Sequence, residues 1–308
     1  MQFLQDLISI SGASSDESNI KKELLNYIEK TQHSWKQIPQ IIDGDEFQDT
    51  FILVFGKPRT AIYAHIDTIG FSVSYDNQLV KIGGPVLEDG FQLVGKDSSG
   101  EIETELLVIE QPNSNTPQLK CVFPRTIDRG TILTFKPNFR DTESTIQSPY
   151  LDNRLGVWNA LKVAETLENG AIVFSTYEEH GGNTVGFCAA YLYNNFFIKQ
   201  SLISDITWIT EHVHHGKGVV ISLRDSGLPR KSFLNRIIQL ANKSGIDYQL
   251  EVESAGGSDG TTLQKSDLLI DWCFIGAAED NVHTPNEIVA KYDIVCMVEL
   301  YRYLMKHL

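Results

Sequence analysis

The feature that most constrains the fold is a series of apolar, strand-like runs, each followed by a charged side chain. Three such runs occupy residues 60–64, 171–177 and 202–204, and the residues that follow them are His65, Glu178 and Asp205. Open α/β sheets bind ligands beyond the carboxyl ends of their strands, so these groups are expected to converge on one rim. Charged groups in that position are costly to desolvate without a partner. The pattern therefore predicts an α/β fold with a polar site at the strand ends.

Composition is that of a globular enzyme. The 308 residues are 42% hydrophobic and 21% charged, which carries no signature of disorder. A net charge of −14 argues against nucleic acid or an anionic membrane as partner. No apolar stretch approaches the roughly 20 residues of a membrane span, and the N-terminus lacks the basic start of a signal peptide. The scattered cysteines predict reduced thiols in a cytoplasmic protein: Cys121, Cys188, Cys273 and Cys296.

The pattern of helix-like and strand-like segments changes twice along the sequence, which predicts two domains. Residues 1–72 and 145–308 alternate helical and strand patterns, which predicts a mixed central sheet flanked by helices. Residues 73–144 consist of short apolar runs separated by turn clusters, including 83–85, 88–90, 97–100 and 112–115, which predicts an inserted small β-barrel. Ser14 and Glu17 have the spacing of a capping box for a helix reaching about Lys30. A final amphipathic helix is expected from near Ile288.

The carboxylates and histidines form an ordered set with the chemistry of metal ligands. Imidazole and carboxylate groups are the ligands of hydrolytic zinc and of other first-row metals. Asp152 precedes a helix start, where its carboxylate can bridge two cations. The two predicted ligand sets share Asp152: one is His65, Asp152 and Asp205, and the other is Asp152, Glu179 and His283. Two such ions about 3.5 Å apart would activate a water and polarise a carbonyl together.

The remaining acids of this set have supporting roles. Asp67 lies two residues after His65, so on a strand both side chains share a face, and Asp67 is expected to orient the site. Of the adjacent Glu178 and Glu179, only one can easily face a metal ion. The other is free to act as a general base on a water molecule.

These residues are embedded in motifs that resemble the tetrahedral and glutamyl aminopeptidases (metallopeptidase family 42), a branch of the co-catalytic di-zinc exopeptidases. The gap of 87 positions between His65 and Asp152 places the extra β domain where that branch carries it. The similar segments are AHIDTIGF (64–71), LDNRLG (151–156), EEHGG (178–182), SDIT (204–207), HHGKGVVI (214–221), GGSDG (256–260) and VHTPNE (282–287).

The resemblance implies an aminopeptidase that hydrolyses N-terminal residues from peptides through a metal-activated water. It implies two divalent metal ions per chain, zinc first, with cobalt or manganese as alternatives. Glu178 would be the general base and Asp67 a further catalytic residue. Gly257, Ser258 and Asp259 would line the substrate site, and the insert would support homo-oligomers from dimer to dodecamer. Thr68 and Asn153 depart from the usual acids, which affects substrate preference and assembly more than chemistry.

Two alternative functions are weighed against this hypothesis. The GGSDG segment matches the GxSxG nucleophile elbow, which would make Ser258 the nucleophile of a serine hydrolase. That alternative leaves His65, Asp152 and the glutamate pair unexplained. A non-catalytic, peptide-binding relative is the second alternative, although the ligands and the base are all present. The cluster of His212, His214 and His215 is expected to be an exposed polar loop, because it has no acid at a motif spacing, with a pocket-lining role as the alternative.

Overall fold

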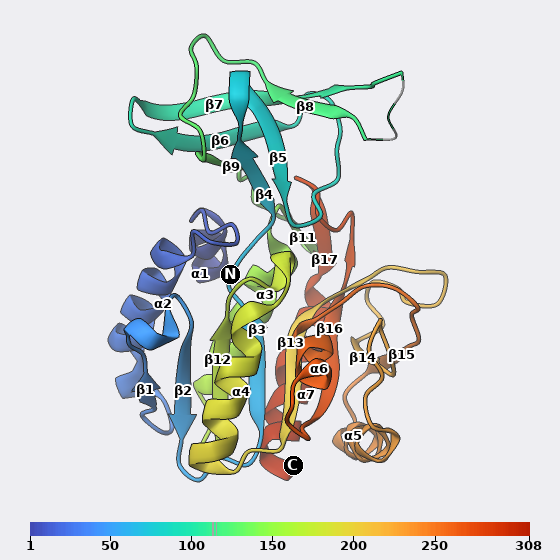
Figure 1. Cartoon of the computed structure of the whole chain (residues 1–308). Coiled ribbons are helices and arrows are strands. Elements are labelled where there is room, and N and C mark those ends of the chain that lie inside the picture. The colour runs from blue at the N-terminus through green and yellow to red at the C-terminus, as the bar shows by residue number, and fades with distance from the viewer. Residues whose placement is uncertain (113, 115) are drawn as a thin grey trace.

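The computed structural model describes residues 1–112, 114 and 116–308 (Figure 1). Residues 113 and 115, in the turn predicted at 112–115, lie outside the described residues. Among the described residues, no helix combines the length and the apolar character needed to cross a membrane. The α-helices are α1 (Gln2–Ile8), α2 (Ser18–Thr31), α3 (Leu151–Ala164), α4 (Asn183–Phe196), α5 (Lys231–Ser244), α6 (Asp259–Lys265) and α7 (Lys291–His307). Short 3-10 helices are η1 (Gln32–Ser34), η2 (Asp45–Phe47), η3 (Tyr75–Asn77) and η4 (Glu178–His180).

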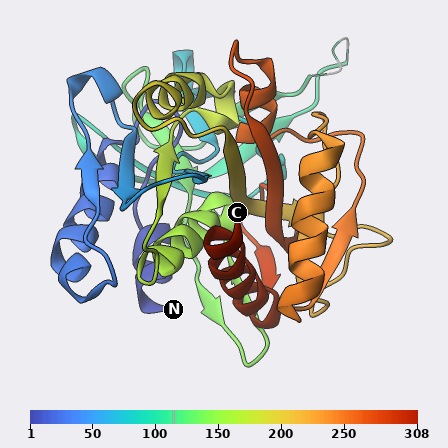
Figure 2. The same ribbon diagram turned by 90° about the horizontal axis from the view of Figure 1, so that it is seen from below.

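A large mixed sheet forms the centre of the molecule, with its strands in the order β1-β2-β12-β3-β13-β16-β17-β11-β10 and with β14 joined to β16 and β15. Its strands are β1 (Gln40–Ile42), β2 (Phe51–Phe55), β3 (Ala61–His65), β10 (Arg140–Asp141), β11 (Thr145–Ser148), β12 (Gly170–Ser175), β13 (Gln200–Trp208), β14 (Val219–Ser222), β15 (Tyr248–Glu251), β16 (Asp271–Asp280) and β17 (Glu287–Ala290). The buried strands β3, β12, β13 and β16 run parallel to their neighbours in this group. Helices lie on both faces of the sheet (Figure 2).

The inserted domain is a closed antiparallel barrel with strand order β4-β5-β8-β7-β6-β9, set above the large sheet in Figure 1. Its strands are β4 (Gly70–Val73), β5 (Gln78–Ile82), β6 (Gln92–Asp97), β7 (Gly100–Ile109), β8 (Gln118–Cys121) and β9 (Ile132–Phe135). The fold class predicted from sequence is confirmed. The barrel begins at Gly70, slightly before the expected boundary, and β10 pairs with β11 in the large sheet rather than with the barrel.

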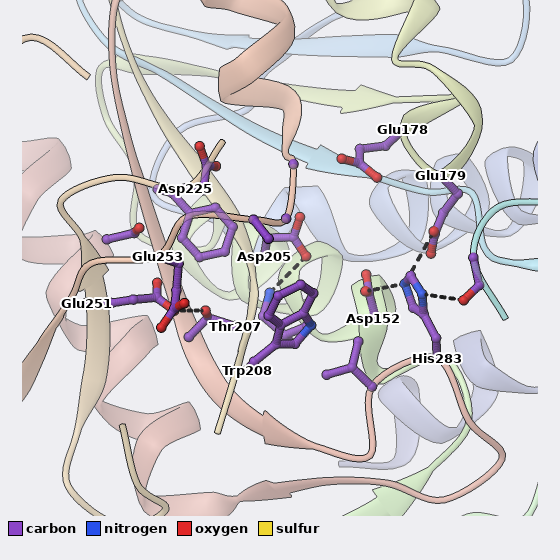
Figure 3. Close-up of a pocket in the computed structure, with 18 of the residues that line it drawn as sticks. Asp152, Glu178, Glu179, Asp205, Thr207, Trp208, Asp225, Glu251, Glu253 and His283 are labelled. Atoms are coloured by element: carbon purple, nitrogen blue, oxygen red, sulfur yellow. Dashed lines mark hydrogen bonds and ion pairs between the residues drawn. The ribbon is translucent and has the colours of Figure 1, made fainter. Parts of the chain in front are cut away.

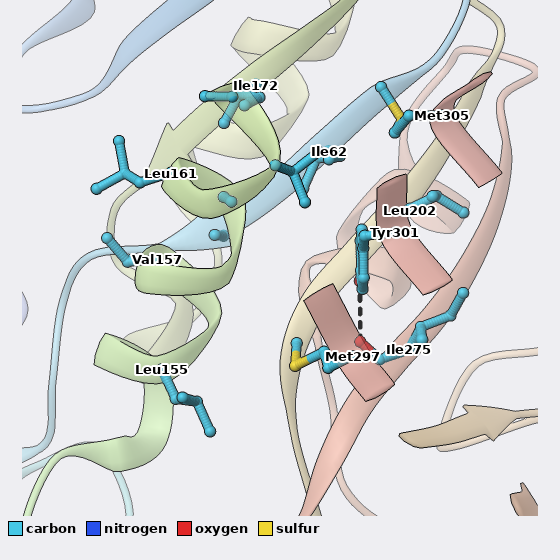
Figure 4. Packing of buried hydrophobic residues seen from close by; sticks show 14 of the residues in the cluster. Ile62, Leu155, Val157, Leu161, Ile172, Leu202, Ile275, Met297, Tyr301 and Met305 are labelled. Carbon is cyan, nitrogen blue, oxygen red and sulfur yellow. Dashed lines mark hydrogen bonds between the residues drawn. The ribbon is translucent and has the colours of Figure 1, made fainter. Parts of the chain in front are cut away.

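Each face of the sheet buries its own hydrophobic cluster. Side chains of α1, α2, α3, α5 and α7 pack on one face, whereas α4 and α6 cover the other. Figure 4 shows α3 and α7 packed against the central strands through residues such as Leu161 and Met297. The buried Tyr301 hydroxyl lies 2.6 Å from the carbonyl of Ile203 and 2.8 Å from that of Ile275, which ties α7 to β13 and β16. These contacts make a rigid base for the strand ends.

The N-terminal helix entry differs from the sequence-based expectation. The predicted capping box at Ser14 and Glu17 is wrong: α2 begins at Ser18, its N-cap is Glu17, and no side chain caps it. Instead the Ser14 hydroxyl donates to Oδ2 of Asp67 at 2.6 Å. The backbone around Ser14 pairs with Thr68, so this segment is extended and serves the site rather than the helix.

Candidate metal centre

The candidate site lies where the parallel strands end, facing the barrel. His65 is the last residue of β3 and stands beside Ser175, the last residue of β12. Asp205 lies within β13, and Asp152 lies in the first turn of α3. Helix α3 approaches β13 closely: a Cβ at Gly156 would be 2.2 Å from the carbonyl oxygen of Ser204. Only glycine permits this approach, which brings Asp152 next to Asp205.

The first triad consists of His65, Asp152 and Asp205, all buried. Nε2 of His65 lies 3.3 Å from Oδ1 of Asp152 and 3.5 Å from Oδ2 of Asp205. The candidate ligand atoms lie within 4.8 Å of one another. Three nitrogen and oxygen donors at that separation can surround a single cation.

The second triad consists of Asp152, Glu179 and His283. Nε2 of His283 lies 3.2 Å from Oδ2 of Asp152 and 3.3 Å from Oε2 of Glu179, as the dashed lines in Figure 3 mark. Asp152 therefore turns one oxygen toward each histidine, and the two triads meet at its carboxylate. This is the arrangement that a bridging carboxylate requires.

The far nitrogen of each imidazole is held by a backbone carbonyl. Nδ1 of His65 donates to the carbonyl of Asp67 at 3.1 Å, and Nδ1 of His283 donates to the carbonyl of Gly84 at 3.0 Å. These hydrogen bonds leave the Nε2 lone pair of each ring free to bind a metal ion. Gly84 belongs to the loop between β5 and β6, so the barrel domain helps to orient a residue of the second triad. The neighbouring Gly83 N–H also donates to Nδ1 of His180, at 3.2 Å.

The carboxylates around the two histidines raise the pKa of both imidazole rings. Burial works against a charged His65, but Asp205, Asp152 and Asp67 raise its pKa well above the usual value. Burial likewise opposes a charged His283, yet Asp152 and Glu179 raise its pKa to about 12. Burial raises the pKa of Asp205 to about 6 and, with the charge of Asp152, that of Glu179 to about 7. The site thus concentrates negative charge that needs positive partners.

Divalent cations fit these residues. The donors are imidazole and carboxylate groups, the set that first-row metals prefer. In addition, Oε1 of Glu179 is buried and lacks a hydrogen-bond partner among the described residues. An unpaired buried carboxylate oxygen is costly unless a cation or a donor satisfies it. The residues could therefore hold two metal ions, one at each triad, with Asp152 shared.

Glu178 and Asp67 lie next to the triads without belonging to them. Glu178 lines the same cavity, and its Oε2 is 4.0 Å from Nε2 of His65. Burial raises the pKa of Glu178 well above its ordinary value. Asp67 is fully buried and accepts hydrogen bonds from the backbone N–H groups of Glu178 at 3.1 Å and Glu179 at 3.2 Å. Asp67 therefore shapes the turn that presents both glutamates.

Two buried residues position the site, and neither was assigned a role from the sequence. The guanidinium of Arg154 donates to the carbonyls of Leu7, Ile10 and Ile66, which anchors the backbone between His65 and Asp67. The carboxylate of Glu287 accepts from the backbone N–H of Asp152 at 3.2 Å and from that of His283 at 3.0 Å. The sequence signal for each was its place inside a motif that carries a ligand, LDNRLG (151–156) for Arg154 and VHTPNE (282–287) for Glu287.

Only one of the three residues expected to line the substrate site in the glycine-rich segment does so. Gly257 lines the cavity. Ser258 and Asp259 are buried outside the cavity lining: the Ser258 hydroxyl donates to Asp225 at 3.0 Å and accepts from the Gly260 N–H, and Asp259 accepts from Ser175. Ser258 caps α6 and has no histidine partner among the described residues, so this geometry does not support a serine nucleophile.

The histidine cluster at 212–215 lies apart from the triads. His212 and His214 are exposed, as expected for a polar loop. His215 is half-buried near Asp293, which binds the backbone of the same loop through Gly216 and Gly218. These contacts are typical of a structural loop.

Comparison with known proteins agrees with this arrangement. A family model described as M42 glutamyl aminopeptidase matches residues 97–300, about two thirds of the chain. An aminopeptidase from the archaeon Desulfurococcus kamchatkensis has a similar structure, with a TM-score of 0.84, 19% identity and coverage of 100% of this chain and 94% of that one. The Pyrococcus horikoshii TET1 peptidase has a TM-score of 0.79, 20% identity and coverage of 99% and 98%.

A Thermotoga maritima protein described as an endoglucanase also matches, with a TM-score of 0.72, 16% identity and coverage of 98% of this chain and 96% of that one. At such low identities the structural matches establish the fold alone. The family match covers most of the chain and includes Asp152, Glu178, Glu179, Asp205 and His283. The chain therefore belongs to the M42 glutamyl aminopeptidase family of peptidases.

Proposed function

We propose that this protein is a metal-dependent aminopeptidase that removes N-terminal residues from peptides. It would hold two divalent ions, zinc first, with cobalt or manganese as alternatives, through His65, Asp152, Glu179, Asp205 and His283. The observation that carries the proposal is the position of the Asp152 carboxylate, with its two oxygens 3.3 Å and 3.2 Å from the two histidines. Membership of the M42 family supports the aminopeptidase class.

The chemistry divides between the ions and the protein. Divalent ions, when bound, would polarise the scissile carbonyl and lower the pKa of a water molecule. Glu178 lines the cavity without joining either triad, so it is free to take a proton from that water and return it to the leaving amine. A raised pKa suits this proton transfer near neutral pH. Asp67 acts as a positioning residue through the backbone of Glu178 and Glu179.

Replacing Glu178→Gln tests the role of the base. The substitution keeps the size of the side chain and removes its ability to accept a proton. We expect turnover of aminoacyl-anilide substrates to fall by about 10²–10⁴-fold, the typical contribution of a positioned general base. Metal content, measured by mass spectrometry after gel filtration, should stay at the wild-type value. Full activity in this variant would contradict the assignment.

The metal requirement and the serine alternative are separated by inhibitors. A chelator should abolish hydrolysis, and added zinc, cobalt or manganese should restore it. A serine-directed fluorophosphonate should have no effect, and Ser258→Ala should retain activity if it remains folded. Active protein that contains no metal would overturn the proposal.

We further propose the division into a catalytic domain at 1–72 and 145–308 and an inserted domain at 73–144 that mediates self-association. The Pyrococcus horikoshii relative is described as assembling into a tetrahedron or an octahedral shell, which supports a homo-oligomer between a dimer and a dodecamer. Exposed apolar side chains on the barrel, among them Tyr75, Val80 and Val122, support this contact surface. Light scattering that gives an active 34.6 kDa monomer at micromolar concentration would contradict it.

Buried free thiols support a cytoplasmic location.

A further inference from the structure

The cavity that contains the triads extends to a second group of acids. Its volume is about 300 Å³, and it is lined at one end by the triad residues and at the other by Asp225, Glu251 and Glu253. Figure 3 shows these three carboxylates gathered across the cavity from His283, with Trp208 between the two groups. The triads do not use these acids, and the sequence motifs do not include them.

The second group of acids lacks a positive partner within the cavity. The described residues that line the cavity include no lysine or arginine. No ion pair of Asp225, Glu251 or Glu253 occurs among the described residues either. Arg224 is close to Asp225, but its Nε donates to the Asp225 backbone carbonyl at 3.2 Å and the residue stands outside the lining.

Hydrogen bonds hold two of the acids, Glu251 and Asp225, in place, and the neighbouring acids disfavour the charge of Glu251. Oε1 of Glu251 accepts from the Thr207 hydroxyl at 2.5 Å, and Asp225 accepts from Ser258 at 3.0 Å and from the Gly227 N–H at 2.5 Å. Burial raises the pKa of Glu251, and the charges of Glu253 and Asp225 raise it further. A cation entering this end of the cavity would relieve that repulsion.

The cavity wall between the two groups suits an aliphatic chain. Trp208 is 41% exposed although it lines the cavity, and its ring packs against the backbone of Gly256, where a Cβ would be 3.4 Å from the indole. Ile206 and Phe274 add apolar surface. Lysine and arginine pack their methylene stems on such surfaces while the charged head reaches a polar partner.

We propose that the acidic end of this cavity recognises the side chain of a basic N-terminal residue, so that the enzyme prefers peptides beginning with lysine or arginine. Glu251 and Glu253 are the counter-ions, Asp225 strengthens the field, and Trp208 supports the aliphatic stem. This inference rests on the proposed aminopeptidase function and deepens it. An N-terminal glutamate, the residue in the family's name, would place a fourth carboxylate beside these three and is expected to be the poorest substrate.

The test compares basic substrates with uncharged analogues that keep the side-chain stem, and with an acidic substrate. The metal-loaded wild-type protein is assayed with lysyl, norleucyl, arginyl, citrullinyl and glutamyl anilides, and kcat/KM is measured for each. Norleucine keeps the stem of lysine without its ammonium group, and citrulline does the same for arginine. We expect lysine to exceed norleucine, and arginine to exceed citrulline, by about 10- to 100-fold, the value of a hydrogen bond to a charged group.

Variants then locate the preference. Glu251→Gln, Glu253→Gln and the double variant should lower kcat/KM for lysine about 10-fold or more while leaving norleucine within about two-fold. The matched control is Glu143→Gln, which removes an exposed acid outside the cavity lining. It should leave every ratio unchanged. Melting curves identify any variant that fails to fold, and the wild-type ratios stand independently of the variants.

Each result decides the inference. If lysine and norleucine react equally, or if glutamate is preferred, the inference is overturned while the proposed function stands. If the double variant weakens all substrates by the same factor, the acids bind the common α-amino group and the side-chain preference is wrong. If no anilide is hydrolysed under any metal condition, the proposed function itself fails.

Discussion

The two triads share Asp152 but lie in different surroundings. The His65 side chain is 2% exposed, and the carbonyl of Asp67 orients its ring. The first triad is built from strands β3 and β13 of the large sheet and from helix α3. The His283 side chain is 25% exposed, and its ring is oriented by the carbonyl of Gly84 in the barrel domain. Groups outside the barrel therefore orient the His65 ring of the first triad, whereas the barrel supplies the carbonyl that orients the His283 ring of the second.

For the proposed metal ions, the difference implies two sites of unequal affinity. Residues that orient a ligand contribute typically 10- to 100-fold to metal affinity, and the carbonyl that orients the His283 ring belongs to Gly84, in the β5–β6 loop of the barrel domain. An ion bound by His283 and Glu179 would therefore dissociate more readily than one bound by His65 and Asp205. Movement of the barrel against the large sheet would act on the His283 ring directly, through the Gly84 carbonyl.

The largest effect is expected from Asp152→Ala, because this residue serves both triads. The variant should lose both metal ions, and activity should fall by about 10³-fold or more, since metal ions contribute several kcal/mol to such reactions. His283→Ala should lose only the ion of the second triad and retain about one ion per chain. Metal content and kcat/KM, measured side by side, check both statements.

Equal metal content in those two variants would contradict the division into a stable and a labile site. His65→Ala extends the comparison, because it removes the ring of the more buried triad. Titration with zinc should show a single class of site in His65→Ala and in His283→Ala.

An intermediate effect is expected at the β5–β6 loop of the barrel, whose Gly84 carbonyl contacts the His283 ring. In Gly84→Ala the new Cβ would lie 3.3 Å from Nδ1 of His283, so the ring must shift. Affinity for the second ion should fall by about 10- to 100-fold, and affinity for the first should be unchanged. Gly186→Ala is the matched control, because a Cβ there meets nothing within 4 Å. Competition with a fluorescent chelator measures both affinities; equal losses at both sites would be the contrary result.

The smallest effect concerns pH and the buried acids around the first triad. Burial raises the pKa of Glu17 to about 7 and that of Asp259 to about 7. A carboxyl whose pKa is higher in the folded state stabilises the fold fully below its unfolded pKa of about 4, and this contribution is lost as pH rises through about 7. In excess chelator, the melting temperature should therefore decline between about pH 5 and pH 8.

The variant Glu17→Gln should show a weaker decline over the same range, because it carries no proton to lose. Asp97 acts in the opposite sense, since Arg125 holds its pKa well below the usual value, but that group titrates outside this window. A melting temperature that rises from pH 5 to pH 8 in the chelated wild-type protein would show that these acids do not control it.

Much of the architecture follows from local pattern. The apolar runs before His65 and Asp205 became β3 and β13, and the run of short strands with turn residues became the closed barrel. Both patterns report on neighbours along the chain, where the alternation of burial and the turn chemistry are already encoded. The order of carboxylates and histidines likewise picked out the residues that the structure brings into the two triads.

Local pattern failed where a distant partner decided the outcome. Ser14 has the spacing of a helix cap, but its hydroxyl binds Asp67, which lies 53 positions away. The residues from Ile288, expected to open the final helix, instead form β17 between β11 and β16. In both places a long-range hydrogen bond or strand pairing outweighed a local preference of about 1 kcal/mol or less.

The sequence by itself determined the fold class, the inserted barrel and the identity of the chemical groups, because these depend on residue type and short-range spacing. The tertiary structure alone decided which groups meet: Glu287 between the backbones of Asp152 and His283, the Gly84 carbonyl on the His283 ring, and the acids that face the triads across the cavity. The physical reason is that hydrogen bonds and fields act over a few ångströms in space, whereas the residues involved are separated by up to 199 positions along the chain.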